Sequence, residues 1–165
     1  MGIEIERKFL IKDIADIPFD IEKYPHRTIE QGYICTSPVI RVRRSDDDYI
    51  LTIKGSGLLS REEHELPLDE ETYYTLRDKA DGIVINKRRY LIPLSDIAGN
   101  LSDELSSLTL ELDIFGGMHQ GLIIAEVEFP TEELAVSFCP PDWLSHDVTE
   151  DGRYHNSYLS KNPPP

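Results

Sequence analysis

Charged side chains alternate with apolar ones along several short segments of this sequence. The charged alternating positions are Glu4, Glu6, Lys8, Arg41, Arg43, Lys54, Glu63, Glu65, Lys87, Arg89, Glu111, Asp113, Glu126 and Glu128. Carboxylate oxygens suit hard divalent cations such as Mg²⁺ or Mn²⁺, whereas arginine and lysine suit phosphate oxygens. A complex of a divalent metal with a polyphosphate presents both kinds of surface at once.

The signs of these charges are segregated by segment. Acid pairs lie on the first segment and the last two, and basic pairs lie in the middle of the chain. Side chains two residues apart on one face of a strand are only about 7 Å from each other. Holding several like pairs together is costly unless a ligand of opposite charge neutralises them. A single charged strand face is usually solvated, but the density of charge here favours a ligand site.

The alternation has a period of two residues, which predicts β-strands. About eight strands are expected, at 3–9, 27–36, 40–43, 51–54, 60–67, 83–92, 108–114 and 123–129. Turn residues separate several of them, including Gly55-Ser56-Gly57 and Gly116-Gly117. Most of these strands should therefore be joined as antiparallel hairpins.

Three helices are predicted between and after the strands. One begins after a capping Asp69 and ends at Gly82, a second begins at Thr131 and stops before Pro140, and a short one covers 155–161. The fold class is mainly antiparallel β with a few packed helices. Eight strands can close into a barrel that holds one small ligand. If the charged face points inward, the helices must cover part of the apolar outer face.

Composition sets limits on the class of protein. The chain has 165 residues, 39% hydrophobic and 29% charged, which is typical of one globular domain, predicted over 1–161 with a frayed tail at 162–165. A net charge of −14 argues against nucleic acid or an anionic membrane as partner. No apolar run has membrane-spanning length and no signal peptide is evident. With only two cysteines, the expected location is the reducing cytoplasm.

The opening Glu4-Ile5-Glu6-Arg7-Lys8 has the pattern ExExK and resembles the motif of the CYTH superfamily, also called triphosphate tunnel metalloenzymes. Further segments resemble this family in the expected order along nearly the whole chain. They are IEQGYI at 29–34, IRVRR at 40–44, LTIKG at 51–55, SREEHEL at 60–66, KRRYLIPL at 87–94, LELDIF at 110–115, AEVEF at 125–129 and DGRYHNSYL at 151–159.

The resemblance implies an eight-stranded tunnel that binds a triphosphate and a divalent metal. The metal ligands implied by the resemblance are Glu4, Glu6, Glu111, Asp113, Glu126 and Glu128. The implied phosphate-binding residues are Lys8, Arg41, Arg43, Lys54, Lys87 and Arg89. Glu63 is similar to the carboxylate that orients the attacking water. Arg153 lies in the segment that resembles a helix plugging one tunnel mouth, from which it would reach the terminal phosphate. Arg61 and Glu65 share the inward parity, without a defined role.

Together these features predict an enzyme that hydrolyses the terminal phosphoanhydride of inorganic tripolyphosphate with Mg²⁺ or Mn²⁺. The expected partner is this small molecule, with neither nucleic acid nor membrane. Members of the family differ in their reactions, so two alternatives stay open. One is a nucleoside or thiamine triphosphatase or an adenylate cyclase of the same fold, and the other is a non-catalytic polyphosphate sensor. The oligomeric state is open as well.

Overall fold

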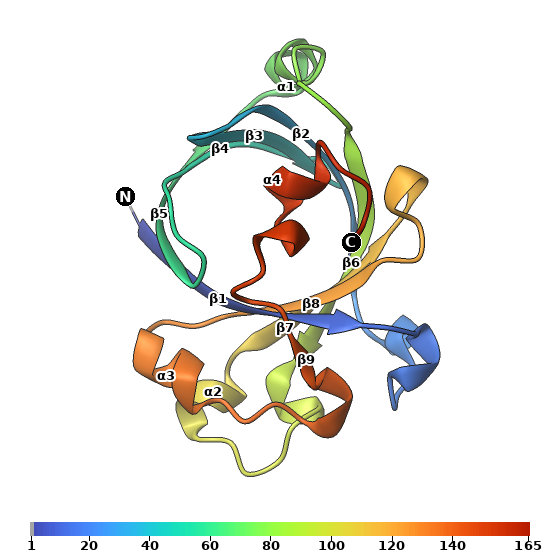
Figure 1. Ribbon diagram of the computed structural model, residues 1–165, viewed down its shortest axis with the longest axis vertical. Helices are drawn as coiled ribbons and strands as arrows, with labels where there is room; N and C mark the ends of the chain where they lie inside the picture. The colour runs from blue at the N-terminus through green and yellow to red at the C-terminus, as the bar shows by residue number, and fades with distance from the viewer. Residues whose placement is uncertain (1) are drawn as a thin grey trace.

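The computed structural model describes residues 2–165, which form a closed antiparallel β-barrel with short helices around and inside it (Figure 1). The strands are β1 (Gly2–Ile11), β2 (His26–Thr36), β3 (Val39–Ser45), β4 (Asp48–Lys54), β5 (Ser60–Pro67), β6 (Ile85–Pro93), β7 (Thr109–Phe115), β8 (Ile123–Glu128) and β9 (His146–Asp147). Eight of them correspond to the predicted strands, and the two-residue β9 was not expected.

The order of the strands explains how the barrel closes. Neighbouring strands follow the order β5-β4-β3-β2-β6-β7-β8-β1, and β1 also pairs with β5. The N-terminal half of β1 pairs with β5, where Gly2 lies opposite Glu63. Its C-terminal half pairs with β8, where Glu6 lies opposite Glu128. The first strand therefore joins the two edges of the sheet, which confirms the predicted closed barrel of eight strands.

The ladders place the charged alternating positions on one face of the sheet. Directly opposed residues point to the same side of an antiparallel pair. Arg41 lies opposite Thr52, Arg89 opposite Asp113, and Lys8 opposite Glu126. This face is the inside of the barrel, so the alternation in the sequence separates a charged interior from an apolar exterior.

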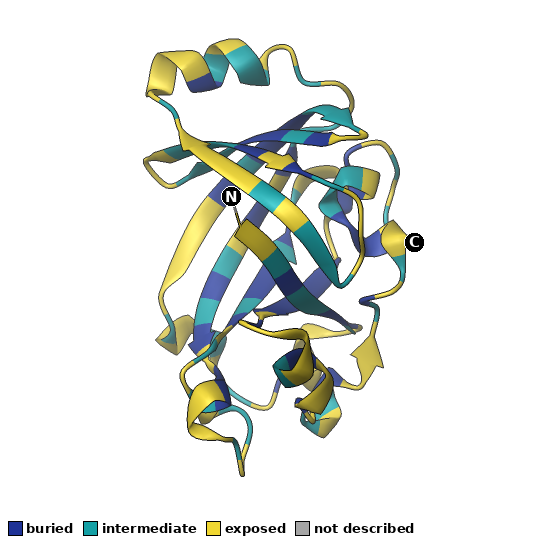
Figure 2. Cartoon of the chain, turned by 90° about the vertical axis from the view of Figure 1, so that its left-hand side faces the viewer, coloured by how far each residue is buried: buried dark blue, intermediate teal, exposed yellow. Residues whose placement is uncertain are grey.

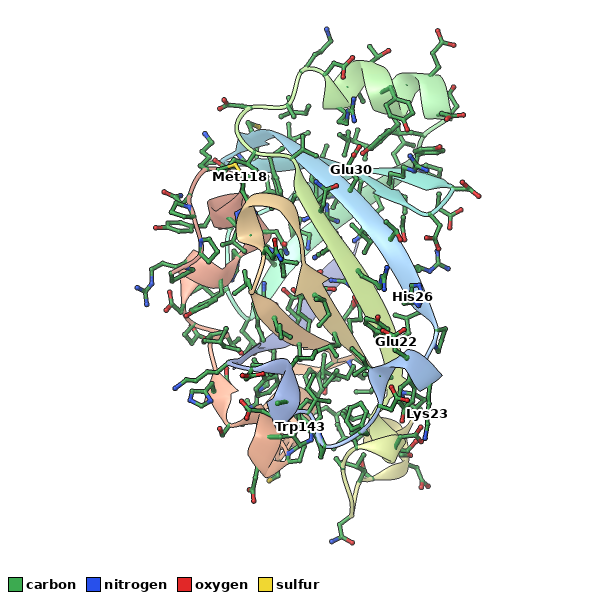
Figure 3. All side chains as sticks on the ribbon, turned by 90° about the vertical axis from the view of Figure 1, so that its right-hand side faces the viewer. Glu22, Lys23, His26, Glu30, Met118 and Trp143 are labelled. Carbon is green, nitrogen blue, oxygen red and sulfur yellow. The ribbon has the colours of Figure 1, made fainter. Side chains whose placement is uncertain are left out.

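Helices and loops cover part of the apolar exterior. On one side lie α2 (Asp103–Ser106) and α3 (Glu132–Ser137), and on the opposite side α1 (Glu70–Arg77) crosses β2, β3 and β4 (Figure 1). The main hydrophobic cluster lies beneath the first pair and includes Phe9 and Leu112, both fully buried. Figure 2 shows that the helices turn exposed surfaces outward. Trp143 (Figure 3) stacks edge-on with Phe19 in the loops over this cluster.

The predicted helices form at their capping residues. Asp69 accepts a hydrogen bond from the backbone N–H of Thr72 at the start of α1, and Thr131 caps α3 in the same way. The helical part of α1 ends at Arg77, earlier than predicted. Packing accounts for this early end, because the chain beyond the helix turns back and the Asp81 N–H donates to the Tyr33 carbonyl of β2.

The C-terminal segment lies inside the barrel. The short turn η6 (Gly152–Tyr154) and the helix α4 (Asn156–Leu159) enter the ring of strands from one end (Figure 1). Tyr154 and Leu159 pack there against inward apolar residues of the strands, including Phe115 and Ile124. One end of the barrel interior is therefore an apolar plug, and the charged residues occupy the remainder.

No helix within the described residues has the length and hydrophobicity needed to cross a membrane. Cys35 and Cys139 are both free.

Candidate active site

A cavity of about 280 Å³ lies inside the barrel, next to the plug. Seven cationic and seven anionic side chains line it, together with four uncharged residues. They are Lys8, Arg41, Arg43, Lys54, Arg61, Lys87, Arg89, Glu4, Glu6, Glu63, Glu65, Glu111, Glu126, Glu128, Tyr33, Val39, Asn156 and Ser157. The structure thus brings together every predicted site residue except Asp113 and Arg153.

Different charged side chains lie at the two ends of the cavity. The buried cations Lys8 and Lys87 lie beside the plug, where the Lys8 Nζ is 3.5 Å from the Tyr154 carbonyl oxygen and the Lys87 Nζ donates to Asn156 Oδ1 at 3.4 Å. Glu65 and Glu128 are exposed at the other end. We call the end at Lys8 and Lys87 the cationic floor, although the buried Glu126 lies beside Lys8 there, and the end at Glu65 and Glu128 the acidic mouth.

Closure of the barrel brings individual acidic and basic side chains of different strands into contact. Because β1 lies beside β5, which in turn pairs with β4, the ammonium of Lys54 donates to both carboxylate oxygens of Glu4, at 2.6 and 2.8 Å. Arg61 is 3.5 Å from the same carboxylate. Lys8 lies 3.5 Å from Glu126 on the neighbouring β8. Most cations of the cavity thus already have a carboxylate partner.

Asp113 is buried behind the wall of the cavity. Its side chain has no exposed surface, and it accepts hydrogen bonds from Lys87 Nζ at 2.6 Å and from Arg89 Nε and Nη2 at 2.7 Å each. Both carboxylate oxygens are engaged. This geometry is not that of the open ligand implied by the resemblance, because the carboxylate faces two cations and does not reach the cavity.

Arg41 and Arg43 are the cations with the fewest partners. Arg41 is buried and its Nη2 donates to Thr52 Oγ1 at 3.0 Å, while the nearest carboxylate to Arg43 is Glu65 at 3.9 Å. The neighbouring charge of Arg41, together with burial, lowers the pKa of Arg43 to about 10. Arg43 therefore remains charged at neutral pH, and both arginines can bind phosphate oxygens through their terminal nitrogens.

Two carboxylates near the middle of the cavity influence each other. Burial, followed by the charge of Glu126, raises the pKa of Glu6 to about 7. Burial also acts against ionisation of Glu126, but Lys8 and Arg89 outweigh it and hold the pKa of Glu126 well below its usual range. Glu6 is therefore the carboxylate that holds a proton near neutral pH, and a bound cation would displace this proton.

Glu63 lies near the mouth on β5. Burial raises the pKa of its half-buried carboxyl group, and the charge of Glu4 adds to this effect. Its Oε1 is 3.8 Å from the Lys54 ammonium. The adjacent Glu62 is exposed and does not line the cavity. The two neighbouring glutamates of β5 thus point to opposite faces of the sheet.

The prediction that Arg153 reaches a terminal phosphate is not supported by its position. Its guanidinium is bound to Asp151 at 2.6 Å, its side chain is 59% exposed, and it does not line the cavity. The turn η6 directs Tyr154 into the barrel, which leaves Arg153 on the outside. Asn156 and Ser157 from α4 line the cavity in its place.

Four lining residues were not predicted as site residues from the sequence. Tyr33, Val39, Asn156 and Ser157 carry no charge, and the alternation of charges gives no signal for them. The parity of Tyr33 within 27–36 could have indicated its direction. Arg61, whose parity was noted, is confirmed as a lining residue.

The donor set fits a hard divalent metal. The cavity offers only carboxylates as anionic ligands, without histidine or cysteine. Within residues 2–165, no three or more such side chains are already arranged around a common point. Mg²⁺ usually binds through one or two carboxylates together with waters and substrate phosphates. This set therefore suits a metal that arrives with a phosphate ligand.

A closed antiparallel barrel around a densely charged cavity defines a class of proteins that bind a small, highly charged ligand inside the barrel. The CYTH domain family matches residues 2–133 of this chain. The inorganic triphosphatase of Nitrosomonas europaea is 37% identical over 160 residues, covering 95% of this chain and 96% of that protein. The inorganic triphosphatase of Acetivibrio thermocellus is 36% identical over 170 residues, covering 99% and 96%. The chain belongs to the CYTH domain family.

Solved structures agree with this membership. The structure of the inorganic triphosphatase NE1496 superposes with a TM-score of 0.65 at 32% identity, covering 100% of this chain and 99% of that one. The structure of HpAC1 from Hippeastrum, at 13% identity and a TM-score of 0.56 over 81% of this chain and 82% of that one, shares the fold.

Proposed function

We propose that this protein is a metal-dependent inorganic triphosphatase that hydrolyses the terminal phosphoanhydride of tripolyphosphate inside the barrel. The observation that carries this proposal is a cavity of about 280 Å³ whose charged lining consists of seven cations and seven carboxylates. Such a lining matches a short chain of phosphates with a divalent metal. The relatives named inorganic triphosphatase, similar over nearly their whole length, support the same substrate.

The cationic floor orients the substrate. Lys8 and Lys87 bind the inner phosphates, and Lys54, Arg41 and Arg43 bind further oxygens. With the inner phosphates held at the plug, the terminal phosphorus lies towards the acidic mouth. This alignment provides proximity and orientation for attack by water from the open side.

Glu63 acts as the base at the mouth. A water attacks the terminal phosphorus, its proton passes to the Glu63 carboxylate, and the P–O bond to the bridging oxygen breaks, releasing orthophosphate and pyrophosphate. A protein nucleophile is not required for this reaction.

We propose that the divalent metal is held by carboxylates drawn from Glu4, Glu6, Glu111, Glu126 and Glu128. When bound, this metal offsets the charge that develops on the phosphate oxygens. Asp113 has another role in this proposal, because its oxygens hold Lys87 and Arg89 in position for the phosphates.

An organic triphosphate fits this cavity less well than tripolyphosphate. The cavity volume of about 280 Å³ lies just below the roughly 300–1,000 Å³ typical of small-molecule pockets. Tyr33 is the one aromatic residue in the lining, and it is 2% exposed. A base or thiazolium ring would have to be placed against charged walls, which offer it little stacking surface.

The test is a comparison of kcat/KM for tripolyphosphate, ATP and thiamine triphosphate with Mg²⁺ and with Mn²⁺, and a separate assay for cyclic AMP. Tripolyphosphate should be preferred and no cyclic AMP should form. A preparation of Glu63→Gln, purified in parallel, controls for a contaminating phosphatase. A tenfold preference for either organic triphosphate would contradict the proposed substrate.

A further inference from the structure

An uncharged glutamine lies directly behind the arginines of the cavity. The inward positions of β2 from 29 to 33 are Ile29, Gln31 and Tyr33, and the ladder with β3 places Gln31 opposite Arg43 and Tyr33 opposite Arg41. Gln31 has no exposed surface. A fully buried amide side chain in this position requires hydrogen-bonding partners.

Three buried polar atoms in this layer have no hydrogen-bond partner within residues 2–165. They are Oε1 of Gln31, Nε of Arg41 and Nε of Arg43. One is an acceptor and two are donors, and they belong to neighbouring residues of one ladder. Leaving such an atom unpaired carries a desolvation cost that no hydrogen bond offsets. The acceptor and either donor could therefore form a hydrogen bond with each other after a small movement of an arginine side chain.

The orientation of the amide follows from its surroundings. Gln31 Nε2 donates to the Tyr33 hydroxyl at 3.3 Å, which leaves Oε1 as the free group. The reverse orientation would direct an N–H group towards the N–H groups of two cations. Oε1 is thus the atom that faces the arginine layer.

We propose that Gln31 is a positioning residue for the phosphate-binding arginines, acting chiefly on Arg43. When phosphate oxygens bind the terminal nitrogens of Arg43, the Nε–H group of this arginine donates to Gln31 Oε1. The guanidinium is then held from behind, with its terminal nitrogens directed into the cavity. This inference rests on the proposed function, since it concerns the phosphate site of the same cavity.

A neutral acceptor is required at this position. A carboxylate in its place would pair with the arginines as Asp113 pairs with Lys87 and Arg89, and the bound phosphate would compete with it. An amide oxygen orients the guanidinium without neutralising it. Gln31 therefore leaves the positive charge of Arg43 available to the phosphate.

The experiment uses two substitutions of Gln31 in the full-length protein. Gln31→Met keeps a similar volume but lacks the acceptor, and Gln31→Glu adds a charge to it. For each variant, kcat and KM are measured with tripolyphosphate, and the dissociation constant is measured by calorimetry with metal-free tripolyphosphate. Gln31→Met should raise KM and Kd about tenfold, the effect of one hydrogen bond to a charged group, with little change in kcat. Gln31→Glu should raise both further.

A double-mutant cycle separates positioning from packing. Arg43→Lys keeps the positive charge but has no Nε–H group to donate, so Gln31→Met should change Kd less than about twofold in that background. Gln31→Met removes the unpaired Oε1 but also the long hydrogen bond from Nε2 to Tyr33, so the melting temperature of the free protein should change little.

Three results would overturn this inference. They are a wild-type Kd for Gln31→Met, an equal loss of affinity with and without Arg43→Lys, or a fall in melting temperature that accounts for the loss. If the wild-type protein neither binds nor cleaves tripolyphosphate, the proposed function fails and this inference fails with it. If only the Gln31 variants behave like wild type, the proposed function stands.

Discussion

Replacing Asp113 by asparagine removes a charge that two buried cations share. The Asp113 carboxylate accepts three hydrogen bonds of 2.6–2.7 Å from Lys87 and Arg89, and it has no exposed surface. The asparagine has nearly the same shape, but it leaves Lys87 without its negative partner and Arg89 with only Glu111 and Glu126. Breaking a buried ion pair in this way typically costs about 3–5 kcal/mol.

The expected loss can be measured as a melting temperature. For a chain of this size, 1 kcal/mol corresponds to roughly 2–4 °C, so Asp113→Asn should melt roughly 6–20 °C below wild type. Asp48→Asn is a matched control, because Asp48 is 3.0 Å from Arg27 but 70% exposed. An exposed pair contributes about 1 kcal/mol at most, and the control should lose no more than about 4 °C.

Tripolyphosphate should restore part of this loss. If Lys87 and Arg89 bind phosphate, the ligand supplies the negative charge that Asp113→Asn has removed. Addition of metal-free tripolyphosphate should then raise the melting temperature of this variant more than that of wild type. Two results would refute the reasoning: a loss as small as that of Asp48→Asn, or an equal ligand shift in the variant and wild type.

Three further predictions concern catalysis and pH. Glu63→Gln should lower kcat roughly 10²–10³-fold with a nearly normal Kd for tripolyphosphate. The matched control Glu62→Gln, at an outward position, should change neither kcat nor Kd. Wild-type turnover of Glu63→Gln would exclude Glu63 as the base. Dialysis against a chelator should abolish phosphate release and Mg²⁺ or Mn²⁺ should restore it, so full activity after chelation would contradict a metal-dependent reaction. Burial and the charges of Lys8 and Arg61 lower the pKa of His155 to about 4. In the unfolded chain the pKa of this histidine is about 6.5, so the unfolded form takes up a proton at a higher pH than the folded form. The free energy of unfolding therefore falls as pH falls from about 6.5 to 4. The free energy of unfolding, measured with urea at pH 7 and pH 5, should fall by about 2 kcal/mol less in His155→Gln than in wild type. Equal falls in the two proteins would show that His155 is not buried as a neutral ring.

The strands were predictable from the sequence because the barrel separates two environments. Each strand faces a charged interior and an apolar cover, so its side chains alternate, as Glu4, Ile5 and Glu6 do. The helix α2 was not predicted, because four residues are too few to show a helical period. A local pattern of residues does not reveal which strands pair when they are far apart in the sequence. The contact of β1 with both β5 and β8 therefore became visible only in the structure.

Charge in the sequence indicated most of the residues that line the cavity, but gave no signal for the uncharged ones. The search for charged alternation found Arg41 and Arg43 but not Gln31 and Tyr33, which face them across the ladder. Parity alone placed Asp113 on the inward face, but its burial depends on how closely β6 and β7 approach. The direction of Arg153 depends on a turn of three residues, whose geometry no periodicity describes.

The arrangement of charge explains why the ligand should carry both signs. The sequence separates acids and bases by strand, which suggested that like charges repel inside an empty barrel. In the closed barrel, however, Glu4 of β1 is bound by Lys54 of β4, and Lys8 of β1 lies near Glu126 of β8. The free cavity is therefore nearly balanced, with seven cations and seven carboxylates.

Binding must exchange these internal pairs for pairs with the ligand. A bare polyphosphate would bind the cations and leave the glutamates buried without partners, and a bare metal would do the opposite. Each unpaired buried charge carries a large desolvation cost. A complex of metal and polyphosphate satisfies both sets at once, since the metal takes the carboxylates as the phosphates take the lysines and arginines. If the proposed function holds, the balance that stabilises the free barrel should therefore favour the metal-bound form of the substrate over either component alone.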